Sequence, residues 1–302
     1  MIKNFEELRQ LALGGAKERG GYVVSVANAA DREVIETVKE LRALGIAEAI
    51  LTGERAVIEN MCREIGLDPL PEIVEASGEA DAAEQAVRLV SGGRAHVLMK
   101  GLVNTSTFLR AVLNPDWGLR GDGLLCHLGA FDIPSWNKIQ FHTDAGMIPA
   151  PTVDQKKQMI KQAVAVLNRL GIEEPKVAAL CANEVVNPKM PATVEAAQLQ
   201  KWNEEGEITG CIVEGPIALD VALSREAADH KKLPSKIAGE TDLFLMPDIE
   251  AGNLVGKTLM FLAGAKMAGI ILGAKCPIVL VSRSDNAEAK VNSLAFALAS
   301  LE

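Results

Sequence analysis

The clearest chemistry follows a short apolar run, Ile278–Val281, whose β-branched residues are typical of a strand buried on both faces. The run ends in the polar turn Ser282–Asp285. A helical pattern comes next, and Ser284 or Asp285 is suited to cap its first turn. A helix N-terminus offers free N–H groups to an anion, and open α/β sheets bind ligands where their strands end. Arg283 adds a guanidinium that can hold phosphate or carboxylate through two parallel bonds. The alternative is an ordinary capped turn with a solvated arginine.

A second predicted strand, Val97–Met99, ends in a similar polar turn before a helical pattern. Lysine is rarely buried without a partner, so Lys100 at the end of this strand is expected to face an anion or a carboxylate. Asn104 and Thr105 lie at the start of the predicted helix. Arg110 lies about one and two-thirds helical turns after Asn104, and it either reaches the same edge of the sheet or lies on the surface. These four polar residues are candidate substrate-binding residues.

A turn rich in glycine and proline follows the predicted strand Lys138–Phe141. It contains two further candidate substrate-binding residues, Asp144 and Gly146. Such a turn is also a candidate crossing between two domains. Thr152, at the end of this segment, is suited to cap the helix that follows.

The run Gly252–Thr258 has some features of a Walker phosphate loop. That loop needs four residues between its glycines, and this run has three. Pro247–Glu250 also separates it from the preceding strand, whereas a Walker loop follows its strand closely. Nucleotide hydrolysis is therefore rejected for this segment. Gly252 and Asn253 are retained as candidate ligand contacts at a helix start, with a simple turn and helix as the alternative.

Other common catalytic patterns are absent from the sequence. The four histidines and five cysteines show no spacing typical of metal ligands, and there is no G-x-S-x-G nucleophile motif. No G-x-G-x-x-G fingerprint follows the first predicted strand, which argues against a standard dinucleotide site. The sequence therefore favours chemistry without metal or covalent nucleophile, in which arginine, lysine and backbone N–H groups hold an anion.

Composition narrows the class of protein further. The 302 residues carry a net charge of −9, which disfavours a general nucleic-acid surface. Five cysteines, an odd number without a C-x-x-C pair, together with no signal-peptide pattern, predict free thiols in a reducing cytoplasm. No run approaches the ~18 apolar residues that a membrane-spanning helix requires.

Strands alternate with helices along the whole chain, which predicts βαβ units and parallel sheets. One of these strands, Ile208–Val213, leads to Pro216, which is suited to a first helical turn. The expected fold is α/β, with two lobes of mostly parallel sheet. The expected first domain spans residues 1–143 and is completed by the C-terminal helix 285–302. The expected second domain spans residues 144–284.

Five blocks, in one order and spread over nearly the whole chain, resemble the butyryl branch of the phosphate acetyl/butyryltransferase family. Any one block alone would be a weak signal. The blocks are Met99–Leu113, Val186–Thr193, Glu214–Ser224, Leu245–Asn253 and Ser282–Asp285.

The resemblance implies the phosphate butyryltransferase reaction, in which a butanoyl group moves reversibly between coenzyme A and inorganic phosphate. Acyl-CoA and phosphate are then the partners, and coenzyme A is substrate and product. No permanently bound cofactor and no metal are implied. The resemblance also implies two α/β domains around an interdomain cleft, a fold similar to that of isocitrate/isopropylmalate dehydrogenases. It further implies a homo-oligomer, a dimer or larger.

The resemblance also implies catalytic roles. In the acetyl branch of the family, a Ser-Arg pair that matches Ser282 and Arg283 is assigned to transition-state and phosphate contacts. The aspartate that acts as base in that branch matches Ala289 here when the sequences are aligned without gaps. Asp285 is then the candidate base, with Glu288 as its rival.

Two alternatives remain open at this point. One is a phosphate acetyltransferase, which a comparison of acyl-CoA chain lengths would separate from the butyryl enzyme. The other is a ligand-binding protein on the same scaffold without catalysis, which is suggested by the missing aspartate at position 289.

Overall fold

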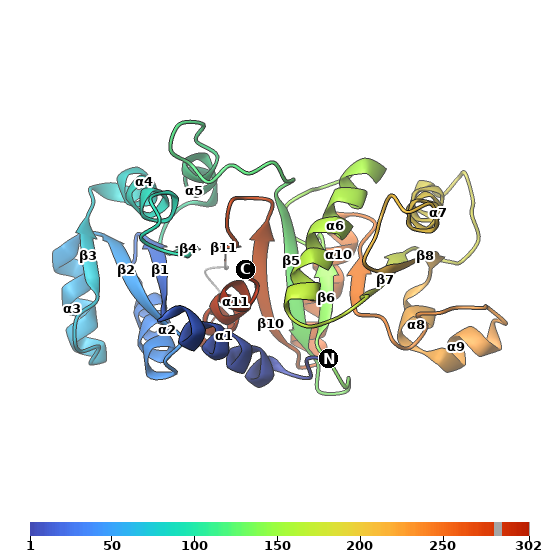
Figure 1. Cartoon of the computed structure of the whole chain (residues 1–302), viewed down its shortest axis with the longest axis horizontal. Coiled ribbons are helices and arrows are strands. Elements are labelled where there is room, and N and C mark those ends of the chain that lie inside the picture. The colour runs from blue at the N-terminus through green and yellow to red at the C-terminus, as the bar shows by residue number, and fades with distance from the viewer. Residues whose placement is uncertain (281–285, 302) are drawn as a thin grey trace. The chain divides into compact units, whose positions relative to one another are not determined.

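Alternating strands and helices form two α/β units in the computed structural model, which describes residues 1–280 and 286–301 (Figure 1). One unit comprises residues 5–122 and 268–302, and the other comprises residues 1–4 and 123–267. The chain therefore passes between the units near residues 4, 122 and 267. The sequence predicts a domain boundary between residues 143 and 144. That boundary stays a prediction.

The unit containing residues 5–122 has strands in the order β3-β2-β1-β4-β11-β10. All neighbouring pairs are parallel except β10 and β11, which run antiparallel. Strand β11 is shorter than the predicted Ile278–Val281. The strands are β1 (Tyr22–Ala27), β2 (Ala47–Gly53), β3 (Glu72–Glu75), β4 (Val97–Lys100), β10 (Lys266–Leu272) and β11 (Ile278–Val279).

The described residues of this unit form six helices. They are α1 (Phe5–Arg19), α2 (Arg32–Ala43), α3 (Arg55–Ile65), α4 (Gly78–Ser91), α5 (Thr105–Val112) and α11 (Ala287–Ala299). Helix α11 packs against α1, α2, β4 and β11, and its residues from Lys290 to Leu298 are all buried. Two of its buried polar side chains have partners on the neighbouring helices: Arg9 donates to Asn292 Oδ1 at 2.7 Å, and Lys290 Nζ donates to Glu33 Oε2 at 2.6 Å. Such pairing is the usual requirement for a charge in a core.

The cap of helix α11 differs from the prediction. Asn286 occupies the cap position, and its side-chain oxygen accepts a hydrogen bond from the N–H of Ala289 at 2.9 Å. The predicted caps, Ser284 and Asp285, lie outside the described residues. Asparagine caps a helix as well as serine or aspartate does, so residue type alone could not select the position.

The unit containing residues 123–267 has strands in the order β5-β6-β9-β7-β8. Only β5 and β6 are antiparallel, and the other neighbours are parallel. Both units are thus mostly parallel α/β structures, and the predicted fold class is confirmed. The strands are β5 (Cys126–Asp132), β6 (Gln140–Thr143), β7 (Lys176–Leu180), β8 (Ile212–Ile217) and β9 (Leu243–Leu245).

The helices of this unit are α6 (Val153–Arg169), α7 (Pro191–Glu204), α8 (Leu219–Leu223), α9 (Arg225–His230) and α10 (Ile249–Leu262). Thr152 caps α6 as predicted, and with Gln155 it forms a capping box.

The prediction for Pro216 was wrong. This residue was expected in the first turn of a helix after a strand at Ile208–Val213, but it lies inside β8. Strand β8 is at the edge of its sheet, where a residue without an N–H group does not interrupt a ladder on both sides. The N–H groups of Val213 and Gly215 donate to side-chain oxygens of Asn203 and Gln200 on helix α7, each at 3.0 Å.

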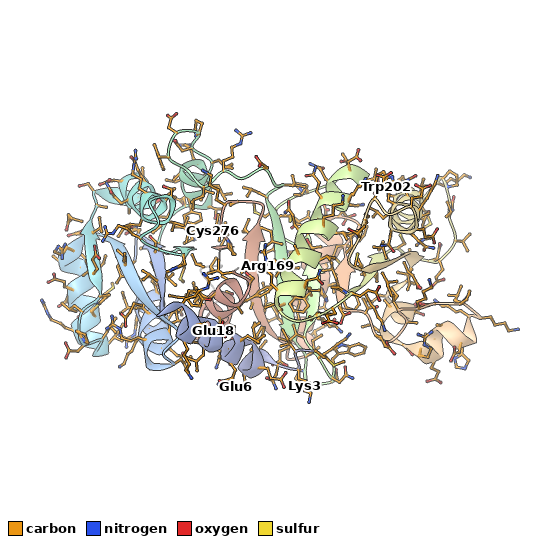
Figure 2. The ribbon with its side chains drawn as sticks, in the orientation of Figure 1. Lys3, Glu6, Glu18, Arg169, Trp202 and Cys276 are labelled. Atoms are coloured by element: carbon orange, nitrogen blue, oxygen red, sulfur yellow. The ribbon has the colours of Figure 1, made fainter. Side chains whose placement is uncertain are left out.

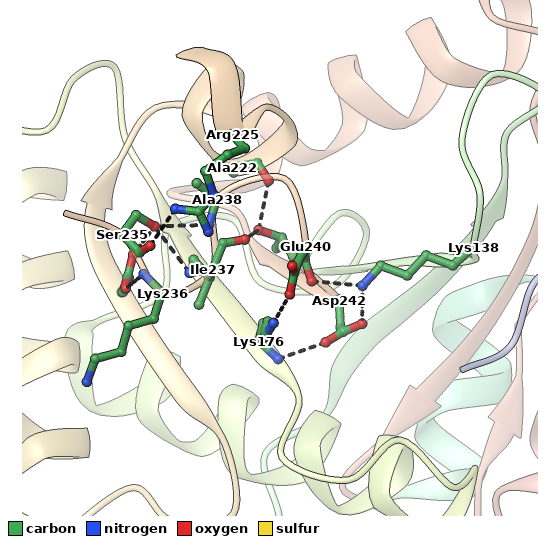
Figure 3. Close-up of polar contacts among 12 residues, drawn as sticks. Lys138, Lys176, Ala222, Arg225, Ser235, Lys236, Ile237, Ala238, Glu240 and Asp242 are labelled. Carbon is green, nitrogen blue, oxygen red and sulfur yellow. Dashed lines mark hydrogen bonds and ion pairs between the residues drawn. The ribbon is translucent and has the colours of Figure 1, made fainter. Parts of the chain in front are cut away.

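A polar network fixes the segment between α9 and β9 (Figure 3). Lys138 Nζ donates to the Glu240 carbonyl at 2.8 Å and to Asp242 Oδ1 at 2.5 Å, and the Lys176 ammonium pairs with Glu240. The buried Thr241 hydroxyl donates to the Ala222 carbonyl at 2.9 Å. The two lysines therefore tie this segment to the chain just before β6 and to the first residue of β7.

No helix among the described residues is both long and apolar enough to cross a membrane.

Candidate functional site

The predicted catalytic residues Ser282, Arg283 and Asp285 lie outside the described residues. The structure defines the elements on either side of them. Strand β11 ends at Val279, beside Met99 of β4, and helix α11 starts at Ala287. The predicted turn thus connects a strand of a parallel pair to a helix N-terminus.

Lys100 is the last residue of β4, next to a tight turn formed by residues 101–104. Its side chain is buried, and Nζ donates to the carbonyl oxygens of Gly101 at 3.2 Å and Val103 at 3.1 Å. The ammonium group therefore lies against the carbonyl groups of this turn. The sequence predicts that Lys100 faces an anion or a carboxylate, and that expectation stays a prediction.

Asn104 directs its donors toward a carboxylate of helix α4. Its backbone N–H and its Nδ2 both donate to Glu79 Oε2, at 3.0 and 2.8 Å. Asn104 is the N-cap residue of α5, and its side chain makes no cap hydrogen bond. Glu79, a residue of helix α4, therefore holds the first turn of α5 in place of a side-chain cap.

Thr105 and Arg110 are both exposed. Thr105 is the first residue of α5, and Arg110 lies in the last turn of the helix. Their roles as substrate contacts remain predictions.

Asp144 organises the turn after strand β6. Its Oδ1 accepts hydrogen bonds from the N–H groups of Gly146 at 2.7 Å and Met147 at 2.8 Å, and its Oδ2 accepts from the N–H of His127 at 3.0 Å. Only 2% of Asp144 is exposed. Hydrogen bonds to a charged acceptor are stronger than neutral ones, so these three bonds fix the backbone of the turn. Gly146, in the same turn, is exposed.

Helix α10 brings the other two predicted residues to this turn. A side-chain carbon at Gly252 would lie 2.5 Å from the Asp144 carbonyl oxygen and 2.9 Å from Ala145 Cα, so only glycine allows this approach. Asn253 Nδ2 lies 3.5 Å from the Ala145 carbonyl oxygen. The structure thus brings Gly252 and Asn253 to the turn that contains Asp144 and Gly146, although the two pairs are far apart in the sequence.

His142 lies in the strand that precedes this turn, near His127. His142 in β6 is fully buried between the rings of Phe131 and Phe244, with centroid distances of 4.7 and 5.0 Å. Burial, with a smaller contribution from nearby His127, lowers the pKa of His142 from its ordinary 6.5 to about 3. His142 is therefore neutral at physiological pH, and its Nε2 lies 3.1 Å from Gln140 Oε1. These contacts indicate a structural histidine.

The cysteines are unsuited to nucleophilic catalysis. Burial raises the pKa of Cys276, between β10 and β11 (Figure 2), to about 12. Burial and the charge of Asp144 raise the pKa of Cys126 to about 12. A thiolate is the reactive form of cysteine, and these residues hold almost none at neutral pH.

Within residues 1–280 and 286–301, no three His, Cys, Asp or Glu side chains are grouped as a metal ion would require. Glu288, the rival candidate base, lies in the first turn of α11 with its Oε1 3.8 Å from Arg9 Nη2, and its side chain is 43% exposed.

Sequence reasoning missed two residues that contact the segment after β4, which contains the candidates Lys100 and Asn104. These two residues are Asn28 and Glu79. Asn28 had a recognisable signal: it follows strand β1 and adopts a left-handed conformation, with φ of 53°, which asparagine tolerates better than most residues. Glu79 had no local signal, because its partner Asn104 lies 25 residues along the chain.

Comparisons with known proteins agree with the sequence pattern. The family model described as phosphate acetyl/butaryl transferase matches residues 70–298. The phosphate butyryltransferase of Clostridium acetobutylicum is 44% identical over 98% of this chain and 98% of its own length. The phosphate acetyltransferase of Thermotoga maritima is 41% identical over 96% of this chain and 97% of its own length.

A solved structure agrees as well. A branched-chain phosphotransacylase from Enterococcus faecalis is similar with a TM-score of 0.83 and 34% identity, over 92% of this chain and 98% of that chain. The chain therefore belongs to the phosphate acetyl/butaryl transferase family, and the resemblance predicted from the five sequence blocks is confirmed.

Proposed function

We propose that this protein is a phosphate butyryltransferase, an acyltransferase that moves a short-chain acyl group, butanoyl, reversibly between coenzyme A and inorganic phosphate. The observation that carries the proposal is the 44% identity, over 98% of the chain, to a relative with that name. Relatives named phosphate acetyltransferase, at 41% identity and below, make acetyl transfer the second candidate.

In the proposed reaction, a phosphate oxygen attacks the carbonyl carbon of the thioester. A C–O bond forms, the C–S bond breaks, and coenzyme A leaves as a thiolate that takes up a proton. Negative charge on phosphate then approaches a developing oxyanion, so the protein must supply preorganised donors. In the reverse direction the thiol of coenzyme A, with a pKa of about 8.5, must lose its proton, and a carboxylate base assists.

We assign the catalytic roles as the sequence suggests. Arg283 holds phosphate with its two-pronged guanidinium, and Ser282 stabilises the oxyanion together with backbone N–H groups at the helix start. Asp285 is the general base, with Glu288 as its rival. The match to the family model, residues 70–298, includes all four positions and supports this assignment.

The substrate-binding roles are assigned to both units. In one unit we propose Lys100, Asn104, Thr105 and Arg110. In the other unit we propose a second set: Asp144, Gly146, Gly252 and Asn253. The carboxylate of Asp144 accepts three backbone hydrogen bonds, so we propose that it acts by shaping the turn that presents Gly146.

Coenzyme A is proposed as substrate and product, and no resident cofactor or metal is assigned. The charge that develops during acyl transfer is of a kind that arginine, lysine and N–H groups can stabilise. The five free cysteines favour a reducing compartment, so we propose the cytoplasm.

We further propose a homo-oligomer in which helix α10 contributes to the interface. All residues of this helix are described, and its buried ones are Gly252 and Gly256. Large apolar side chains on its outer face are exposed: Leu254 by 67%, Phe261 by 78% and Leu262 by 83%. Burying each would contribute roughly 1.5–3 kcal/mol. A second copy supplies the same face by two-fold symmetry, which is the commonest arrangement of homo-oligomers.

The test is release of free thiol from butanoyl-CoA in the presence of phosphate, with the acyl phosphate trapped by hydroxylamine. We expect the highest kcat/KM with butanoyl-CoA among acyl-CoA esters of increasing length. A higher kcat/KM with acetyl-CoA would favour the acetyltransferase. No thiol release with any ester would favour a ligand-binding protein without catalysis.

A variant tests the catalytic assignment. Arg283→Lys should lower kcat/KM on the order of 10²-fold, comparable to removing one preorganised donor, because lysine cannot form two parallel bonds to phosphate. Arg63→Lys, an exposed arginine paired with Glu59, is the matched control and should be unaffected. Near-normal turnover in Arg283→Lys would mean that another group holds phosphate.

A further inference from the structure

The turn after β4 is held by the chain segment that follows β1. The N–H groups of Gly101 and Leu102 donate to the carbonyl oxygens of Ala27 at 2.9 Å and Asn28 at 2.8 Å. In return, Asn28 Nδ2 donates to the Leu102 carbonyl at 2.6 Å. The two segments approach so closely that a side-chain carbon at Gly101 would lie 2.5 Å from the Asn28 carbonyl oxygen. The position of the turn therefore depends on Asn28.

Asn28 is itself fixed. Its N–H donates to Thr52 Oγ1 at 3.2 Å, and the Thr52 hydroxyl contacts the carbonyl oxygens of Val26 at 3.1 Å and Ala82 at 2.8 Å. Thr52 is fully buried. The backbone of Asn28 is thus held at the strand end through Thr52, which contacts β1 and α4, and the side-chain amide of Asn28 extends from this fixed point to the turn.

Glu79 holds the other end of the turn. It lies in the first turn of α4, and both donors of Asn104 reach its Oε2. A carboxylate is favoured at a helix N-terminus, and its hydrogen bonds to N–H groups are stronger than neutral ones. The segment from Lys100 to Thr105 is therefore fixed at both ends, by Asn28 and by Glu79.

We infer that Asn28 and Glu79 are positioning residues, which hold the Lys100–Thr105 segment in the geometry that binds an anionic substrate. The inference rests on the proposed function, since that function gives the segment its substrate. Neither residue is assigned to contact substrate. They keep the segment ordered before substrate binds, so that less conformational entropy is lost on binding. Their removal should therefore weaken binding more than it slows the chemical step.

The test compares Glu79→Ala, Glu79→Gln and Asn28→Asp with the control Glu84→Ala. Glu84 lies on the same helix, and it pairs with Arg88 of that helix at 2.8 Å. For each chain we would measure kcat, KM for phosphate, KM for butanoyl-CoA, the melting temperature, and hydrogen exchange of the amides of residues 101–105.

Glu79→Ala should raise one of the two KM values about tenfold, consistent with the loss of hydrogen bonds to a charged acceptor. Its kcat should stay within about twofold, and exchange of the 101–105 amides should become faster. Glu79→Gln keeps an oxygen acceptor and should recover most of the affinity. Asn28→Asp cannot donate to the Leu102 carbonyl and should behave like Glu79→Ala. Glu84→Ala should match the unaltered protein.

Three results would overturn the inference: unchanged KM values in Glu79→Ala, equal effects in Glu84→Ala, or a lower melting temperature and kcat without faster exchange at residues 101–105. A failure of the proposed function looks different. In that case the unaltered protein would release no thiol from any acyl-CoA, while the exchange measurements would still report whether Glu79 and Asn28 hold the segment.

Discussion

Gly101 follows strand β4 where two stretches of backbone are in close contact. Its substitution by alanine would place a carbon 2.5 Å from the Asn28 carbonyl oxygen and 2.7 Å from the Ala27 carbonyl oxygen. Both are backbone atoms, so relief requires one segment to move. Gly101→Ala should lower the free energy of unfolding by roughly 1–3 kcal/mol and should also reduce acyl transfer, because Lys100 moves with the turn. Urea unfolding and the thiol-release assay would measure the two effects.

Gly14 is the matched control for this substitution. It lies inside helix α1, and a side-chain carbon there would meet no atom within 4 Å. Gly14→Ala should raise the free energy of unfolding by ~0.5–1 kcal/mol, the usual gain for alanine in a helix, and leave activity unchanged. If both glycine variants were equally stable, the close approach at Gly101 would not constrain the fold.

His142 should make stability depend on pH. Its pKa is about 3 in the folded chain and near its ordinary 6.5 when unfolded, so between these values the unfolded chain binds a proton that the folded chain does not. Stability is therefore lost as the pH falls from about 6.5 toward about 3, by ~1.4 kcal/mol for each unit.

The measurement is the free energy of unfolding at pH 8 and pH 5. In the unaltered protein it should fall by ~2 kcal/mol more than in His142→Gln, which cannot take up this proton. Equal falls in the two chains would show that His142 is protonated as easily in the folded state as in the unfolded state.

At the scale of secondary-structure elements, helix α10 explains a misleading sequence pattern. The two glycines that suggested a phosphate loop lie one turn apart on its inner face. Gly252 contacts the Asp144–Ala145 backbone, and Gly256 faces the Phe131 ring, where an added side-chain carbon would lie 3.3 Å from the ring. The spacing of three residues between glycines is thus a helix-packing spacing, since residues four apart share a face.

The two glycines should differ on substitution. Gly252→Ala should lower the free energy of unfolding by ~1–3 kcal/mol because backbone atoms block the new methyl group. Gly256→Ala should be nearly neutral, because an aromatic ring can shift by a few tenths of an ångström and alanine is favoured in a helix. Calorimetry of both variants tests this order, and a larger loss in Gly256→Ala would reverse the packing argument.

Local sequence signals predicted these elements unevenly. Apolar periodicity and capping residues such as Thr152 marked most strands and helices, because those signals act within a few residues. The short helix α9 was missed, since six residues contain too little periodicity. Strand β8 was misplaced because Pro216 is unusual in a strand and is tolerated only at an edge.

Candidate site residues could be named from the sequence where their chemistry is local, and their roles stay predictions. Lys100 was named because a lysine that ends an apolar strand is conspicuous in the sequence. The contact between Glu79 and Asn104, and the grouping of Asp144 with Gly252, depend on elements that meet only in the folded chain. No local pattern encodes those contacts.

At the scale of the whole molecule, each unit carries candidate residues at the carboxyl end of a parallel strand. Lys100 ends β4 in one unit, and Asp144 follows β6 in the other. Ligands of open α/β sheets bind at such ends, because loops there can vary without disturbing the core. A net charge of −9 disfavours anions in general. Positively charged side chains therefore have to be concentrated where an anion binds, and Lys100 at the end of β4 is one such side chain.

The exposed face of helix α10 leads to a prediction about assembly. Leu254, Phe261 and Leu262 lie on this face, spaced seven and one residues apart, and are 67%, 78% and 83% exposed. Apolar side chains gathered on one face favour association with a matching surface. We expect the protein to be an oligomer at micromolar concentration and Phe261→Glu to shift it toward monomer, because a buried unpaired charge opposes association. Sedimentation velocity would measure both states.

Val185→Glu, at a 70% exposed position on a different segment, is the control and should leave the oligomer intact. A monomeric unaltered protein, or an oligomer unaffected by Phe261→Glu, would exclude α10 as the interface.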